Sequence, residues 1–148
     1  MKKSIKVGWI GTGVMGKSMA GHLMKHGYKD MYVYNRTAAK ADELVKNGAK
    51  FMSPLEVAKH SDYLFLMLGY PHDVEKMVFC SQSGILNHMR PGSFLIDHTT
   101  SSPGLAQKIH KELKQRQVHS IDAPVSGGDI GARNGKLVTM MGGDDSAI

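Results

Sequence analysis

Three glycines near the start of the chain are spaced in a way that favours a phosphate-bearing ligand. An apolar run at residues 5–10 is predicted to be a short buried strand. The next six residues are Gly11, Thr12, Gly13, Val14, Met15 and Gly16. In this pattern the first glycine allows a tight turn, the second lets the backbone approach a pyrophosphate, and the third lets the following helix pack on the strand. The stretch predicts a dinucleotide site, with an ordinary glycine-rich turn as the alternative.

The residues after the second predicted strand, at 31–34, indicate which dinucleotide fits. An NAD site has an acidic residue here that binds the ribose hydroxyls. This chain instead has Asn35, Arg36 and Thr37, which supply an amide, a guanidinium and a hydroxyl. An arginine near this position accommodates the extra phosphate of NADP. We therefore predict NADP as the cofactor and NAD as the second choice, with a solvated turn as the alternative role for Arg36.

A second glycine-rich segment, at residues 122–137, follows the sixth predicted strand. Its composition argues against a core element, and Ser126, Gly127 and Gly128 offer a hydroxyl and unobstructed backbone N–H groups. Such groups can form a nest for a carboxylate. In open α/β sheets ligands bind at the carboxyl ends of the strands, where this segment is expected. It is a candidate carboxylate site, with a long surface turn as an equal alternative.

The elements that would position these residues alternate between strands and helices. Further strands are predicted at 50–52, 63–68, 93–97, 118–121 and 137–141, and helices at 15–26, 37–46, 54–60, 71–79 and from 102 onward. In the helix at 37–46 Thr37 is the expected cap, and Ala41, Leu44 and Val45 are expected to face inward. The alternation predicts an α/β fold with a doubly wound, mostly parallel sheet of the Rossmann-like kind.

Composition narrows the class of partner. With 148 residues, 41% hydrophobic and 22% charged, the chain is expected to form one globular domain. Its net charge of +6 is spread along the sequence, which favours anionic small molecules over nucleic acid. No signal peptide or membrane span is recognised, and the single Cys80 fits a reducing compartment. We predict a cytoplasmic location, with the mitochondrial matrix left open, and no metal site, because the eight histidines lack metal-ligand spacing.

Four stretches of the sequence resemble the β-hydroxyacid dehydrogenases, in the same order along the chain: residues 11–16, 35–37, 97–103 and 122–128. The family includes 3-hydroxyisobutyrate dehydrogenase, tartronate semialdehyde reductase and the glyoxylate/succinic semialdehyde reductases. The resemblance implies cofactor contacts at residues 11–16 and 35–37, around Leu68 and Gly69, and at Thr100. It also implies carboxylate contacts at Ser126, Gly127 and Gly128. The family's catalytic lysine lies in a following all-helical domain, and no position in this chain matches it.

The resemblance implies an NADP-dependent oxidoreductase that transfers hydride between the nicotinamide and a small β-hydroxyacid or aldehyde acid. A relative of 6-phosphogluconate dehydrogenase, an imine reductase relative and a non-catalytic NADP-binding module are the alternatives. His98 is the best histidine candidate for proton transfer, although a structural role is favoured for it. Because Asp145 or Ser146 resembles the cap of a helix that does not follow, residues 1–148 are expected to be one domain of a longer enzyme. That enzyme would form oligomers through its helical domain.

Overall fold

A six-stranded parallel sheet forms the centre of the computed structural model, which describes residues 4–148. Its strands are β1 (Val7–Ile10), β2 (Met31–Tyr34), β3 (Lys50–Phe51), β4 (Tyr63–Leu66), β5 (Phe94–Asp97) and β6 (His119–Asp122). Their spatial order is β3-β2-β1-β4-β5-β6, so β1 pairs with β2 on one side and with β4 on the other. The direction of winding reverses between β1 and β4, which creates a crevice at their carboxyl ends.

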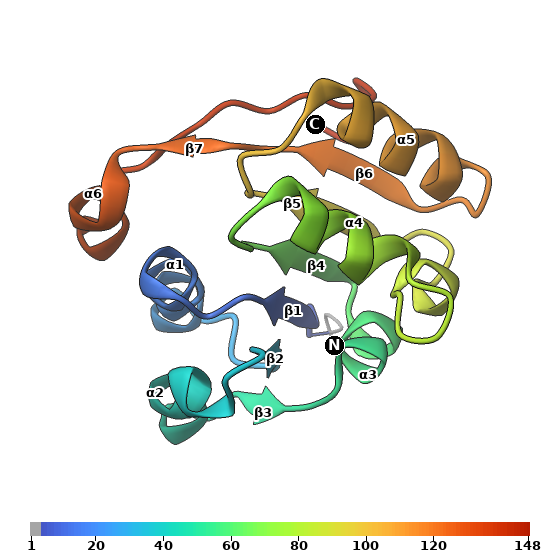
Figure 1. Cartoon of the computed structure of the whole chain (residues 1–148). Helices are drawn as coiled ribbons and strands as arrows, with labels where there is room; N and C mark the ends of the chain where they lie inside the picture. The colour runs from blue at the N-terminus through green and yellow to red at the C-terminus, as the bar shows by residue number, and fades with distance from the viewer. Residues whose placement is uncertain (1–3) are drawn as a thin grey trace.

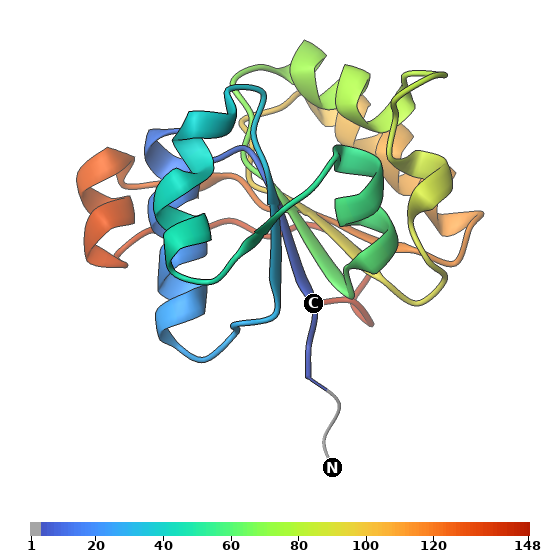
Figure 2. The same ribbon diagram turned by 90° about the horizontal axis from the view of Figure 1, so that it is seen from below.

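Helices cover both faces of the sheet, as Figure 2 shows. One layer holds α1 (Val14–Lys25), the 3-10 turn η1 (Ala38–Ala41), α2 (Asp42–Lys46) and α6 (Gly128–Asn134). The other holds α3 (Pro54–His60), α4 (Pro71–Phe79), the 3-10 turn η2 (Leu86–His88) and α5 (Pro103–Lys114). The predicted doubly wound, Rossmann-like fold is confirmed.

The helix starts follow from local capping chemistry. In α5 the Ser102 hydroxyl accepts a hydrogen bond from the Leu105 N–H at 3.2 Å, and proline occupies the first helical position. The side chains of Leu105, Ile109 and Leu113, spaced four residues apart, are all buried. This helix therefore forms where the sequence predicted it, because the Ser102 cap and the buried apolar face indicate the same helix.

The sheet is buried on both faces, which explains the continuous apolar run of β4. Leu64 and Leu66 are fully buried beneath α3, α4 and α5. On the opposite face Trp9 and Val33 pack with Leu44 of α2. Each fully buried side chain of this size contributes roughly 1.5–3 kcal/mol to the free energy of unfolding.

The predicted helix at 37–46 is only partly correct. The chain forms η1 and then the five-residue α2, and the Thr37 side chain makes no capping hydrogen bond. Ala41 and Leu44 are buried as expected, but Val45 is 41% exposed. The 3-10 turn explains the error, because its three residues per turn shift the apolar face relative to a continuous α-helix.

The glycine-rich segment holds more structure than its composition suggested. Residues 125–139 form an arm made of β7 (Val125–Ser126), α6 and β8 (Val138–Thr139), and β7 pairs antiparallel with β8. The strand predicted at 137–141 therefore lies outside the main sheet. Figure 1 shows the arm running from the end of β6 to α1, on which α6 packs. The helix α6 begins with Gly128 and has Gly131 in its interior, and it is packed on α1, a contact that composition does not reveal.

Among residues 4–148, no helix is long and apolar enough to cross a membrane.

Candidate dinucleotide and carboxylate site

The glycine loop between β1 and α1 has the geometry that its sequence predicted. Gly11 has a φ of +100°, in the region that favours glycine. A Cβ on Gly16 would collide with the carbonyl oxygen of Gly11, so only glycine lets α1 begin this close to the loop. At Gly13, by contrast, an added Cβ would meet nothing within 4 Å. The space above Gly13 is therefore open to a ligand.

The start of α1 lacks the capping groups found on other helices. Gly13 is its N-cap, offers no side-chain hydrogen bond, and no acidic residue occurs in the first turn. The starts of α3 and α5 are instead capped by Ser53 and Ser102. The first N–H groups of a helix need acceptors, and the helix dipole favours a negative one. An anionic group above Gly13 satisfies both requirements.

Two buried hydroxyls beside this loop provide a second test of the fit to a dinucleotide. Thr12 is 1% exposed, and its Oγ1 has no hydrogen-bond partner among the described residues. The Oγ of Ser101, in the loop after β5, is likewise buried without a partner among residues 4–148. A buried polar group left unpaired costs roughly 1–3 kcal/mol. These hydroxyls and the uncapped α1 fit a polar ligand along the carboxyl edge of the sheet.

The loop after β2 is tied directly to the glycine loop. The Asn35 Oδ1 accepts a hydrogen bond from the Thr12 N–H at 2.9 Å, and its Nδ2 donates to the carbonyl oxygen of Thr37 at 2.9 Å. Asn35 therefore holds the two loops in register, a role that sequence reasoning missed. Arg36 and Thr37 are exposed, and the Arg36 guanidinium makes no hydrogen bond or ion pair with residues 4–148. It is free to bind a phosphate beside the glycine loop.

The loops after β4 and β5 are joined in a similar way. The Leu68 N–H donates to the Thr99 Oγ1 at 2.9 Å, and the Thr99 N–H donates to the Asp97 Oδ1 at 2.9 Å. Asp97 and Thr99 are buried, whereas the predicted cofactor residues Gly69 and Thr100 are exposed. The buried pair holds the exposed pair at the carboxyl edge. Sequence reasoning missed this role, although Asp97 stands at a strand end where polar residues gather.

Burial gives Asp97 an unusual acidity. It raises the pKa of the carboxyl to about 6, and the nearby charge of Asp122 adds to the shift, while hydrogen bonds from Thr99 oppose it. Burial also raises the pKa of Asp122, which lies opposite Asp97 in the register of β5 and β6. The folded chain therefore favours the neutral Asp97 carboxyl at mildly acidic pH.

Asp97→Asn is expected to stabilise the chain at neutral pH and above. Because the pKa of Asp97 is higher in the folded than in the unfolded state, its neutral form stabilises the fold at low pH. That contribution is lost as pH rises from about 4 to above 6, by up to about 3 kcal/mol. Asparagine stays neutral and keeps the oxygen that accepts from Thr99. Urea unfolding of both proteins should give equal stabilities near about pH 4, a growing advantage for the variant up to about pH 7, and a constant advantage above that pH. A constant difference between about pH 4 and about pH 7 would contradict the assignment.

His98 has a structural position. Its ring stacks near Trp9 and Phe65, with centroids 6.0 and 5.7 Å away, and its Nδ1 lies 2.7 Å from the carbonyl oxygen of Ala123. Since a carbonyl only accepts, Nδ1 carries the hydrogen. Burial lowers the pKa of His98, partly opposed by this hydrogen bond. The ring therefore fills the core beside the Trp9 indole, whose N–H donates to the Gly11 carbonyl oxygen at 2.9 Å.

Ser126, Gly127 and Gly128 lie at the end of β7 and the start of α6, and all three are exposed. Gly127 and Gly128 have φ values of +134° and +61°, which side chains other than glycine rarely adopt. The packing of α6 on α1 brings this stretch to the same side of the sheet as the cofactor helix. The predicted acid site and the predicted cofactor site are thus carried by two helices in contact.

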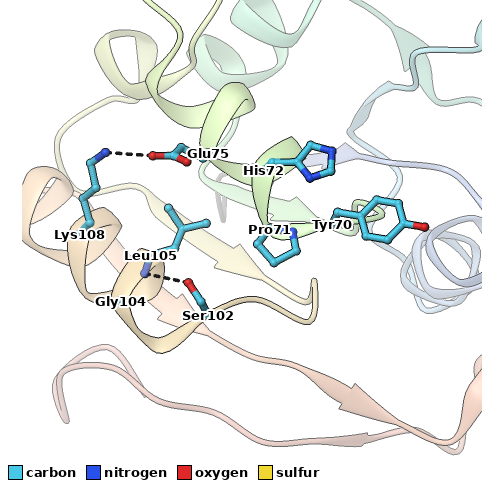
Figure 3. Close-up of a pocket in the computed structure, with 8 residues that line it drawn as sticks. All are labelled: Tyr70, Pro71, His72, Glu75, Ser102, Gly104, Leu105 and Lys108. Atoms are coloured by element: carbon cyan, nitrogen blue, oxygen red, sulfur yellow. Dashed lines mark hydrogen bonds and ion pairs between the residues drawn. The ribbon is translucent and has the colours of Figure 1, made fainter.

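A cavity of about 530 Å³ lies beside the site, between the first turns of α4 and α5 (Figure 3). Its wall includes Tyr70, Pro71 and Ser102, and an ion pair of 3.1 Å joins Glu75 to Lys108 across it. None of the residues predicted to bind cofactor or acid lines this cavity. It borders the loops of the site without being part of them.

Residues 6–148 match the family described as the NAD binding domain of 6-phosphogluconate dehydrogenase, and the chain belongs to this family. The match covers the β1 strand, the glycine loop and the arm. The family assignment and the open space at Gly13 agree on a nicotinamide dinucleotide as the ligand class.

Individual relatives point to hydroxyacid enzymes. The chain is 51% identical over 144 residues to a protein of Arabidopsis thaliana named probable 3-hydroxyisobutyrate dehydrogenase-like 1, mitochondrial, with 97% of this chain and 43% of that one covered. The solved structure of Psf3 in complex with NADP+ and 2-OPP has a TM-score of 0.89 and 29% identity, covering 95% of this chain and 50% of that one. The solved structure of Mycobacterium tuberculosis 3-hydroxyisobutyrate dehydrogenase with L-serine has a TM-score of 0.87 and 27% identity, covering 97% of this chain and 48% of that one. The chain thus spans about half the length of these relatives.

Proposed function

We propose that this chain is the cofactor-binding half of an NADP-dependent oxidoreductase acting on small β-hydroxyacids or the matching aldehyde acids. The nicotinamide, when bound, supplies the hydride chemistry. The residues of this chain bind the dinucleotide, orient it along the carboxyl edge of the sheet and hold the acid group of the substrate. Names of relatives such as 3-hydroxyisobutyrate dehydrogenase and glyoxylate/succinic semialdehyde reductase 1 support this substrate class.

One observation carries the proposal: the first turn of α1 is uncapped and faces open space at Gly13. The N–H groups there, fixed by the fold before any ligand arrives, would donate hydrogen bonds to the pyrophosphate of the dinucleotide. The collision that a Cβ on Gly16 would make shows why the loop cannot be replaced by an ordinary turn.

The preference for NADP over NAD is inferred from Arg36. Its guanidinium is exposed and makes no ion pair within residues 4–148, and Asn35 holds its loop beside the glycine loop. A guanidinium matches the geometry of a phosphate in a bidentate way. The structure of Psf3 with NADP+ supports the same choice.

The substrate carboxylate is assigned to Ser126, Gly127 and Gly128. The two glycines are exposed and have positive φ values, and Ser126, with its hydroxyl, directly precedes them. Backbone N–H groups in such a turn bind small anions. The carboxylate would be held at the start of α6 and the dinucleotide at the start of α1, and these two helices are in contact.

We further propose that the proton-transfer lysine lies outside residues 1–148, in an all-helical domain through which the enzyme forms oligomers. The resemblance to the β-hydroxyacid dehydrogenases and the length of the relatives support this division. A lysine suits the role because burial and neighbouring charges can bring its pKa near the working pH. A location in the cytoplasm or the mitochondrial matrix is proposed on the same basis.

The test compares the 148-residue chain with a longer protein that carries it as its first half. Both should bind NADPH, but only the longer protein should consume NADPH when glyoxylate or succinic semialdehyde is added. NADPH binding without consumption by the longer protein, across these acids and their hydroxyacid counterparts, would indicate a non-catalytic binding module. Consumption by the 148-residue chain would show that the proton-transfer group lies within it.

A further inference from the structure

The arm that carries the proposed acid site is fixed to the rest of the chain at two places. At its base, the Met140 N–H donates to the Pro124 carbonyl oxygen at 3.0 Å, and Asp122 and Gly142 exchange backbone hydrogen bonds. At its tip, α6 packs on α1. The base of the arm continues directly from β6. The contact between α6 and α1 therefore determines where Ser126, Gly127 and Gly128 lie relative to the cofactor helix.

One side chain of α1 bonds to the backbone of the tip. The Nε2 of His22 lies 2.8 Å from the carbonyl oxygen of Ala132 and 3.0 Å from that of Arg133. Both partners can only accept, so Nε2 carries the hydrogen and shares it between them. These carbonyls belong to the last turn of α6, where acceptors outnumber the N–H groups of the helix, although the Ala132 carbonyl oxygen also accepts from the Gly135 N–H at 3.3 Å. His22 thus caps the C-terminal end of α6 from another helix.

The same ring also packs against the residue that ends α6. Gly135 has a φ of +64°, and a Cβ added there would lie 3.5 Å from atoms of the His22 ring. Residues 22 and 135 are far apart in the sequence, yet the ring meets both the carbonyls and the terminating glycine. The His22 Nε2–H holds the end of α6 at hydrogen-bond distance from α1, and the flat His22 ring beside Gly135 limits how α6 can rotate there.

We propose that His22 is a positioning residue that sets the distance between the dinucleotide on α1 and the substrate carboxylate on α6. The inference rests on the proposed function, since it assigns the acid to the arm. His22 lies in the second half of α1, away from the uncapped first turn. Its loss should therefore move the acid site without altering the loop that holds the pyrophosphate.

The test uses the 148-residue chain, with NADPH affinity and L-serine affinity in the presence of NADP+ measured separately. His22→Ala should weaken L-serine binding by about tenfold and leave NADPH affinity within about twofold. His22→Phe keeps a ring against Gly135 but has no N–H donor, and should match the alanine variant. His22→Gln supplies two N–H donors at similar reach and should restore L-serine binding. His26→Ala, on the same helix, is the matched control, because within residues 4–148 the His26 side chain bonds only to the carbonyl oxygen of His22.

Amide hydrogen exchange of residues 131–136 provides a readout that does not depend on the acid. It should speed up in the alanine and phenylalanine variants and return to the wild-type rate with glutamine. Unchanged L-serine affinity in His22→Ala, with the wild type binding normally, would overturn the role of His22 alone. A wild-type chain that binds NADPH but not L-serine would overturn the acid site, and with it the positioning role. The two failures are thus distinguished by the wild type.

Discussion

Gly13→Ala is expected to weaken NADPH binding by about a hundredfold while leaving the stability of the free chain within about 1 kcal/mol of wild type. The added methyl would occupy the open space through which a pyrophosphate reaches the first N–H groups of α1. Loss of two charge-assisted hydrogen bonds, at roughly 1.5–3 kcal/mol each, accounts for an effect of this size. Calorimetry measures the expected loss of NADPH affinity, and urea unfolding of the free protein measures the expected unchanged stability.

Stability should hold because Gly13 has an ordinary backbone conformation. Its φ of −66° and ψ of −165° are open to alanine, and an added Cβ meets no atom within 4 Å. Alanine is a poorer N-cap than glycine, but it also restricts the unfolded chain, and the two effects roughly offset each other. Gly104→Ala, at an equally open position in α5, is the control and should bind NADPH normally. Equal affinity in Gly13→Ala and Gly104→Ala would contradict a pyrophosphate at this loop.

Arg36→Asp is expected to remove a preference of about tenfold to a hundredfold for NADPH over NADH. The guanidinium is available for a phosphate, since it pairs with no other residue between 4 and 148. A carboxylate there would repel the extra phosphate of NADPH and accept hydrogen bonds from the ribose hydroxyls of NADH. NADPH affinity should therefore fall while NADH affinity stays level or rises, as measured by parallel titrations.

A control separates this local effect from a general change in charge. Lys29→Asp makes the same change of charge in the exposed loop between α1 and β2, at the opposite edge of the sheet from the glycine loop. It should lower the affinities for NADPH and NADH by similar small factors. If Arg36→Asp lowered both affinities to the same extent as Lys29→Asp, the assignment of Arg36 to the extra phosphate would be wrong.

The sequence predicted well those elements whose signals are local. α5 begins at its Ser-Pro cap and buries the three apolar residues that its spacing selected. The glycine loop could be predicted in detail because each glycine stands where a side chain would clash with the turn, the ligand or the helix. α2 was harder, since the switch from a 3-10 turn to an α-helix rotates the face and exposes Val45.

The elements that sequence reasoning missed depend on contacts between distant parts of the chain. α6 begins at one glycine and contains another, and it packs on α1, a contact that no local sequence pattern indicates. The roles of Asn35 and Thr99 depend on backbone groups of other loops, and that of His22 on carbonyls 110 and 111 residues away. The residue types at the site could be predicted from the sequence, whereas the side chains that hold its loops together could be identified only in the folded structure.

Calorimetric titration of NADPH into the wild-type chain and Gly13→Ala tests the central claim, that the glycine loop of this chain is a dinucleotide site. The account predicts saturable binding at one site per wild-type chain, and binding about a hundredfold weaker in a variant that unfolds at the same urea concentration. A folded wild-type chain that takes up no NADPH, or a variant that binds it equally well, would contradict the account.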